Sequence, residues 1–194
     1  MTLPTQEQVD ASTQPHIDRL MKHQREIEGA LRDAAKVPDL PRSAEWKAVR
    51  LTALRDKLVG IVAKESCCRD GCSACCHMAT AISTTEARDI SKRTGLPFTD
   101  VAFDLPDRSE QVQKYMGVPC PFLKDSRCSI YEVRPSSCRA NFNLSDYPEI
   151  CSITDAPGRT VPNLNMQALW YAEAAVALEK YDTLADIREF FPRP

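Results

Sequence analysis

Four cysteines lie close together near the middle of this chain, in the pattern Cys68-x3-Cys72-x2-Cys75-Cys76. Thiolates two or three residues apart on a tight loop can converge on one metal ion, because the loop curls around it. Gly71 permits the backbone conformation that such a turn often needs. Zinc accepts four thiolates in tetrahedral geometry, and iron–sulfur clusters also bind thiolates at short spacings. The spacing therefore predicts a metal site.

Three further cysteines, Cys120, Cys128 and Cys138, follow at wider spacing. Alone they would indicate little, but together with the first four they predict a metal site that both groups share and that closes the long loop between them. One tetrahedral ion needs four ligands, whereas two ions that share one bridging thiolate need seven. We therefore expect all seven cysteines to meet at one compact site for zinc or iron, held as one ion, a binuclear centre or an iron–sulfur cluster. The alternative is one four-thiolate centre with three spare thiols.

The nine cysteines allow two other interpretations. In an exported protein they would form disulfides, and buried free thiols are the third option. Three observations favour metal. The number of cysteines is odd, the N-terminus lacks a basic segment followed by an apolar run, and two adjacent pairs occur, Cys67–Cys68 and Cys75–Cys76. Neighbouring cysteines rarely bridge each other.

The combined pattern resembles a known family. Beside the first cluster stand Cys120-Pro121-Phe122-Leu123 and the run Cys128-Ser129-Ile130-Tyr131-Glu132-x-Arg134-Pro135-x-x-Cys138-Arg139. This arrangement is similar to the YkgJ-type cysteine cluster proteins, a family of zinc- or iron-chelating domains. The resemblance spans about residues 68–140 and implies metal chelation without implying a reaction. Related clusters occur in flagellin lysine N-methylase-like proteins, so an accessory role in a methyltransferase-type reaction is a second implication.

Several polar residues beside the cysteines have two interpretations each. Arg134 and Arg139 could neutralise a thiolate cluster and hydrogen-bond to sulfur, or could pair with surface carboxylates. His77 follows the first cluster directly and is either an additional ligand or an ordinary surface histidine. Cys67 and Cys151 lie outside the family pattern. Their roles stay open, although Cys151 or His77 could supply an eighth ligand.

The expected function is metal binding in a structural or metal-handling role, with a metal ion as the partner; whether any reaction is catalysed stays open. An iron–sulfur redox protein is the alternative, because C-x3-C-x2-C is also the spacing of radical S-adenosylmethionine enzymes. Ala74 stands where those enzymes usually carry an aromatic residue, and the chain is too short and too poor in strands for their barrel. A formal net charge of −2 and the absence of a basic stripe argue against nucleic acid as a partner.

The composition indicates a helical protein with a real core. Apolar residues make up 43% of the chain and charged residues 27%. Glycine is scarce (6) and proline plentiful (14), which favours helices joined by proline-containing loops. No apolar run is long enough to span a membrane, and we see no secretory signal. We therefore expect a cytoplasmic protein without membrane contact.

Apolar residues at helical spacing predict an N-terminal helical hairpin over residues 15–64, after a disordered segment at residues 1–14. The second helix should run from Ser43 to about Ala63. The expected inner faces comprise Ile17, Leu20, Met21, Ile27 and Leu31 in the first helix, and Trp46, Val49, Leu51, Leu54, Leu58 and Ile61 in the second.

Helical periodicity stops in the cysteine region, residues 65–140. There the capping-box sequence that begins at Ser83 and ends at Glu86 predicts a helix to Thr94, which Gly95 terminates. Further expected elements are a short helix over residues 107–116, two short extended segments at 120–123 and 128–131 around a polar turn, and a helical turn at 134–138.

The last region, residues 141–194, is loop-rich up to a helix expected over Asn163–Tyr181. Its expected inner face comprises Leu164, Ala168, Tyr171, Ala175 and Leu178. This helix should pack on the N-terminal hairpin. The fold class is therefore mainly α: a small helical domain around a cysteine-rich metal site, with at most a short two-stranded β element.

Overall fold

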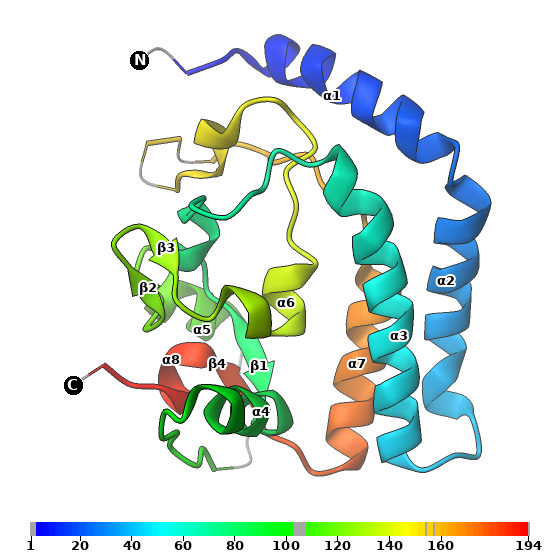
Figure 1. Cartoon of the computed structure of the whole chain (residues 1–194), viewed down its shortest axis with the longest axis vertical. Helices are drawn as coiled ribbons and strands as arrows, with labels where there is room; N and C mark the ends of the chain where they lie inside the picture. Colours follow the sequence, from blue (N-terminus) through cyan, green and yellow to red (C-terminus); the bar gives the residue numbers. More distant parts are fainter. Residues whose placement is uncertain (1–2, 103–107, 154, 157, 194) are drawn as a thin grey trace. The chain divides into compact units, whose positions relative to one another are not determined.

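The computed structural model describes residues 3–102, 108–153, 155–156 and 158–193, and it is mainly helical, which confirms the expected fold class (Figure 1). The chain forms two compact units. Unit 1 comprises Met1–Cys68, Phe142–Ile150 and Thr160–Lys180, and unit 2 comprises Arg69–Asn141, Cys151–Arg159 and Tyr181–Pro194. Among the described residues, no helix has the length and apolar character needed to cross a membrane.

Unit 1 is a helical bundle. Helices α2, α3 and α7 pack on one another, and α1 contacts the short 3-10 turn that follows α3. The bounds are α1 Gln6–Met21, α2 Gln24–Lys36, α3 Ala44–Val62 and α7 Gln167–Glu179. Two ion pairs join α3 to α7, one between buried Lys47 and Glu179 and one between Arg55 and Glu173.

Helix α1 begins earlier than the sequence analysis expected. Residues 6–14, for which we expected disorder, belong to it, and Pro15 lies inside it. The helix starts where it does because Thr5 and Gln8 form a capping box, in which each side chain accepts the other residue's backbone N–H. This short polar signal precedes the first apolar stripe, so periodicity alone did not indicate it.

The N-terminal helix expected through Ile17 and Leu31 is in fact two helices, because the chain breaks at Lys22 and His23 between α1 and α2. Leu20 and Ile27 are buried as expected, whereas Ile17 and Met21 are exposed. The break rotates the two halves of the expected stripe relative to each other, so only part of that stripe reaches the core.

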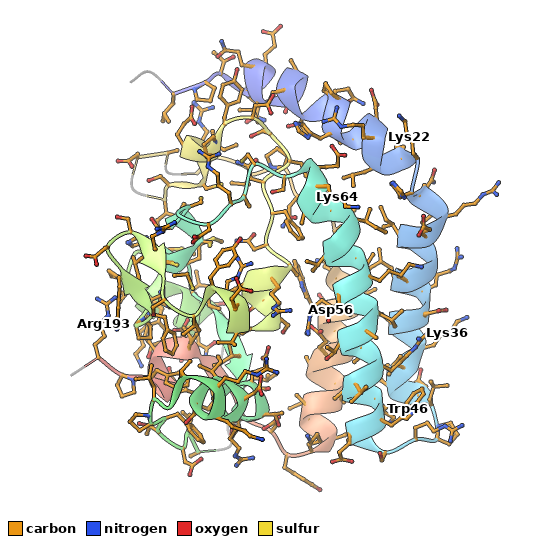
Figure 2. All side chains as sticks on the ribbon, viewed as in Figure 1. Lys22, Lys36, Trp46, Asp56, Lys64 and Arg193 are labelled. Atoms are coloured by element: carbon orange, nitrogen blue, oxygen red, sulfur yellow. The ribbon has the colours of Figure 1, made fainter. Side chains whose placement is uncertain are left out.

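The buried faces of α3 and α7 also differ from the expected ones. In α3 the core side chains are Lys47, Leu51, Leu54, Leu58 and Val62, whereas Trp46 and Val49 are exposed (Figure 2). In α7 they are Leu169, Ala172, Val176 and Ala177, whereas Tyr171 is exposed. Both helices carry apolar residues around most of their circumference, so periodicity could not select the buried face and the packing partner does.

Unit 2 contains two small antiparallel sheets, where we expected at most one. Strand β1 (Ala81–Ser83) pairs with β4 (Leu184–Asp186), and β2 (Leu123–Lys124) pairs with β3 (Arg127–Cys128). The second pair is the predicted hairpin, and its turn residues have positive φ angles of 48° and 60°. The β1–β4 pair joins segments far apart in the chain, and three-residue strands are too short to show an alternating pattern.

The capping-box helix of unit 2 forms as predicted. It is α4 (Thr84–Thr94), and Ser83 and Glu86 cap it reciprocally. Gly95 ends it with φ 71°, a conformation that favours glycine. Local side-chain chemistry defines both ends of this helix, which is why the sequence was sufficient to place it.

Three short helices complete unit 2. They are α5 (Arg108–Tyr115), α6 (Ser136–Arg139) and α8 (Ile187–Phe190). Helix α5 lies within the expected range 107–116, of which residue 107 falls outside the described residues. The core between these elements comprises Ile82, Ala87, Ile90, Phe122, Ile130, Ala185, Ile187, Phe190 and Phe191, and Cys120 and Cys128 pack against it.

The assignment of the buried face of α3 can be tested directly. Leu58 is fully buried (0% exposed) and Val49 is 71% exposed. Leu58→Ala should lower the free energy of unfolding by about 2–5 kcal/mol through the cavity it leaves, whereas Val49→Ala should change it by less than about 0.5 kcal/mol. Urea unfolding followed by circular dichroism measures both, and equal losses would contradict the assigned face.

Candidate metal centre

Main-chain hydrogen bonds join the two cysteine segments. Cys75 and Cys76 lie on the 3-10 turn Ala74–His77, and the Cys76 carbonyl accepts the Cys120 N–H at 2.7 Å. The His77 carbonyl accepts the N–H of Gly117, also at 2.7 Å. Two segments that are far apart in the sequence therefore run side by side at the cysteines.

The remaining cysteines of the second group are held by the core and by a carboxylate. Cys128 ends β3 and packs, like Cys120, against the core of unit 2. Cys138 lies in α6, which the Glu86 side chain holds, because its Oε1 accepts both the N–H and the hydroxyl of Ser136 at 2.8 Å. The same carboxylate caps α4 through its other oxygen. Glu86 thus links the predicted helix to the turn that carries Cys138.

Thiols from both segments interact directly. The Cys76 side chain hydrogen-bonds to those of Cys128 and Cys75. The Cys138 thiol feels the charges of Cys75, Cys120 and Cys128. These electrostatic and hydrogen-bond effects involve five of the seven predicted ligands, with members from the first cluster and from the second.

The surroundings of four of these thiols shift their pKa values in different directions. The hydrogen bond from Cys76 is the main cause that lowers the pKa of Cys128 to about 6, and it raises the pKa of Cys76. Burial raises the pKa of Cys120 to about 11, with the nearby Arg188 cation opposing the shift. Burial also raises the pKa of Cys138 well above its usual range. Near neutral pH, Cys128 is therefore the thiol that ionises most readily among these four.

The other cysteines lie at the ends of the region. None of the nine is in a disulfide. Cys72 is half-buried in a turn where Gly71 has φ 89°. Cys68, the last residue of unit 1, is exposed, and its N–H donates to the Ser66 hydroxyl. The Cys67 N–H donates to a backbone carbonyl within unit 1, and Cys151 ends a 3-10 turn.

The two arginines singled out from the sequence have different surroundings. Arg134 stacks its guanidinium on the Tyr131 ring, 3.6 Å from the centroid. Its charge contributes to the lowered pKa of Cys128 and partly opposes the rise in the pKa of Cys138. Arg139 donates to the backbone carbonyls of Glu132 and Arg134. The neutralising role considered for both arginines is therefore supported by the position of Arg134.

A third arginine, Arg188 in α8, was not a sequence candidate. Its guanidinium pairs with Asp186 and donates to the carbonyls of Cys76, Met78 and Val118. Close by, Arg193 donates to the carbonyl of Cys120 (Figure 2). In the sequence, Arg188 is marked only by an aspartate two residues before it, at the start of a helix. Such a pair is common and gives no reason to place Arg188 near the cysteines. The β1–β4 pairing brings this C-terminal segment to the cysteine region.

The donor set fits a thiophilic metal such as zinc or iron, because thiols, which are soft ligands that both accept, influence one another's pKa across the two segments. Within the described part of the chain, however, no three His, Cys, Asp or Glu side chains already have a metal-binding arrangement. The thiols contact one another as hydrogen-bonded or packed groups. Binding a metal would require them to lose protons and turn toward a common point.

Residues 67–154 match the family model CxxCxxCC, described as "Putative zinc- or iron-chelating domain". This region, somewhat less than half of the chain, is similar to that family of cysteine-rich chelating domains. The match confirms the resemblance, and it extends beyond residues 68–140 to include Cys67 and Cys151. No curated protein and no solved structure matches the chain.

Within the chelating domain, the role of Glu86 as an anchor for α6 can be tested. Glu86→Ala removes the acceptor for two Ser136 donors and for the α4 cap. The free energy of unfolding should fall by roughly 2 kcal/mol, and the amides of Ser136–Arg139 should exchange faster with deuterium. The control is Asp89→Ala, which removes an exposed pair with Arg93 on the same helix. Equal exchange at α6 in both variants would contradict the role of Glu86.

Proposed function

We propose that this chain binds zinc or iron through its clustered cysteines and that it serves a metal-handling or structural role. The proposed ligands are Cys68, Cys72, Cys75, Cys76, Cys120, Cys128 and Cys138. One observation carries the proposal: the hydrogen bond from the Cys120 N–H to the Cys76 carbonyl, 2.7 Å, which joins the backbone of the first cluster to that of the second. The match of residues 67–154 to the chelating family model also supports it.

The pKa values of the thiols bear on how metal loading depends on pH. Cys128, with its pKa of about 6, offers a thiolate at neutral pH, whereas Cys76, Cys120 and Cys138 have raised pKa values. A metal ion would displace protons from the thiols that hold it, since the thiolate is the metal-binding form. Loading therefore releases protons, and the apparent metal affinity falls as the pH falls.

Coordination would stabilise a segment that has little core of its own. Apart from its cysteines, the stretch between Cys67 and Thr80 contains few large apolar side chains, and none of its residues from Cys67 to Met78 is fully buried. Structural zinc sites contribute on the order of 10 kcal/mol of binding free energy to folding. A metal shared by the two cysteine segments would thus lock the backbone pairing between Cys76 and Cys120.

The exposure of the thiols bears on the choice between the two roles. Eight of the nine cysteine residues are half-buried and Cys68 is exposed, although the Cys138 thiol itself is buried enough to have a raised pKa. A metal held at such a site remains accessible to a competing thiol or a partner protein. This accessibility favours metal handling over a purely structural ion.

Metal analysis of protein purified without oxygen tests the proposal. The wild type should contain zinc or iron bound through thiolates. Two ions per chain would indicate the binuclear form with one bridging thiolate, and one mononuclear ion would exclude it. Strong visible absorption bands would indicate an iron–sulfur centre, whereas a colourless zinc protein would remove the redox alternative.

Two serine variants identify the ligands. Cys76→Ser should lower the metal content or prevent folding, because Cys76 connects the two clusters. Cys67→Ser is the matched control, since Cys67 is not a proposed ligand, and its metal content should equal that of the wild type. Wild-type protein without bound metal, even after reconstitution with zinc or iron, would refute the proposed function.

A further inference from the structure

The backbone junction between the cysteine segments surrounds one buried cation. Only 7% of the Arg188 side chain is exposed. Its Nη2 lies within hydrogen-bond distance of the carbonyls of Cys76 and Met78, both at 3.3 Å, and of a third acceptor, Val118. Because the Cys76 carbonyl also accepts the Cys120 N–H, the guanidinium contacts the point where the two segments meet.

Arg188 is itself held in place by a buried carboxylate. Asp186 is fully buried, and its Oδ1 accepts both the Nη1 of Arg188 at 2.8 Å and the backbone N–H of the same residue. Its other oxygen accepts the N–H of Thr80, just after the first cysteine cluster. The Asp186–Arg188 pair therefore holds the C-terminal segment against the backbone that follows the first cysteine cluster and against the backbone just before Cys120.

The charge of Arg188 suits a thiolate site. A divalent ion with four thiolates carries a net charge of −2, which is costly inside a protein unless a cation compensates it. The Arg188 charge reaches the Cys120 thiol. In addition, its buried Nε has no hydrogen-bond partner among the described residues, so one donor of this cation remains available.

We propose that Arg188 is a positioning residue of the metal centre, which sets the geometry of Cys76 and Cys120 by holding their backbone and which compensates the charge of the metal-bound thiolates. This inference rests on the proposed function and assigns a role to a residue outside the cysteine pattern. Removal of a residue that orients metal ligands typically weakens metal binding by about 10–100-fold. We therefore expect removal of Arg188 to weaken metal binding by about 10–100-fold.

The test uses full-length protein and measures zinc affinity by competition with a chromophoric chelator. Arg188→Met removes the cation but leaves Asp186 buried and unpaired, so Arg188→Met combined with Asp186→Asn is the cleaner variant. The double variant should bind zinc about 10–100-fold more weakly than the wild type. Arg188→Lys keeps the charge but loses the planar fork, and its affinity should lie between the two.

Cobalt(II) supplies a readout that a purely structural role would not change. At saturating cobalt, the ligand-field and thiolate-to-cobalt bands of the double variant should differ from those of the wild type, because the sulfur positions change. The matched control is Arg55→Met with Glu173→Gln, which removes an ion pair of unit 1. It should lower thermal stability but leave zinc affinity within about twofold and the cobalt spectrum unchanged.

The outcomes separate this inference from the proposed function. If the wild type binds neither zinc nor cobalt, the proposed function fails and the role of Arg188 fails with it. If the wild type binds and the folded double variant binds equally well with the same cobalt spectrum, only the role of Arg188 is refuted. Should the double variant be unfolded, Arg188→Lys decides: wild-type affinity and spectrum in that variant would overturn positioning by the guanidinium fork.

Discussion

The hydrogen bond from the Cys120 N–H to the Cys76 carbonyl is the contact on which the site depends. Bringing two segments so far apart in sequence together costs chain entropy, and gathering thiolates adds charge repulsion. Backbone hydrogen bonds and packing offset the loss of chain entropy: the Gly117 contact, the β2–β3 hairpin and the core of unit 2 all hold the segments without a metal. The raised pKa values of Cys76, Cys120 and Cys138 limit the charge repulsion, because a protonated thiol carries no charge.

The remaining elements of unit 2 can be understood as supports for that junction. Helix α4 presents Glu86, which holds the turn of Cys138. The β1–β4 pair brings the C-terminal segment, with Asp186 and Arg188, to the other side. Each cysteine segment is thus attached to a part of the chain that folds by ordinary hydrophobic and capping interactions. A metal would add a bond between segments that are already adjacent.

The sequence was most informative where structure depends on neighbouring residues. The two ends of α4 follow from local capping chemistry, and the structure has them as predicted. The turn of the β2–β3 hairpin also lies where its polar residues indicated, although the strands are shorter and closer to the turn than the expected segments 120–123 and 128–131. The face of α3 was predicted in part, since Leu51, Leu54 and Leu58 are buried as expected, and the face of α7 was assigned wrongly. Both helices are apolar around most of their surface, so the packing partner decides which side is buried. The start of α1 was missed because its signal is a pair of polar caps.

At the site, too, the sequence indicated the features that depend on neighbouring residues and not those that depend on distant ones. Cysteine is chemically distinctive, so spacing alone predicted the seven candidate ligands, and five of them affect one another's pKa in the structure. Arg188 is chemically ordinary, and only the pairing of β1 with β4, between distant segments, brings it to Cys76. No local pattern could have indicated it. Charge-compensating residues around a metal site are in general determined by the fold rather than by a motif.

Cadmium-113 NMR of cadmium-loaded protein tests the central claim most directly, since cadmium replaces zinc at thiolate sites and couples through bonds to the β-protons of its cysteine ligands. The account predicts that one cadmium resonance correlates with β-protons of Cys75 or Cys76 and also with those of Cys120, Cys128 or Cys138. Correlations confined to cysteines of the first cluster would contradict the shared site.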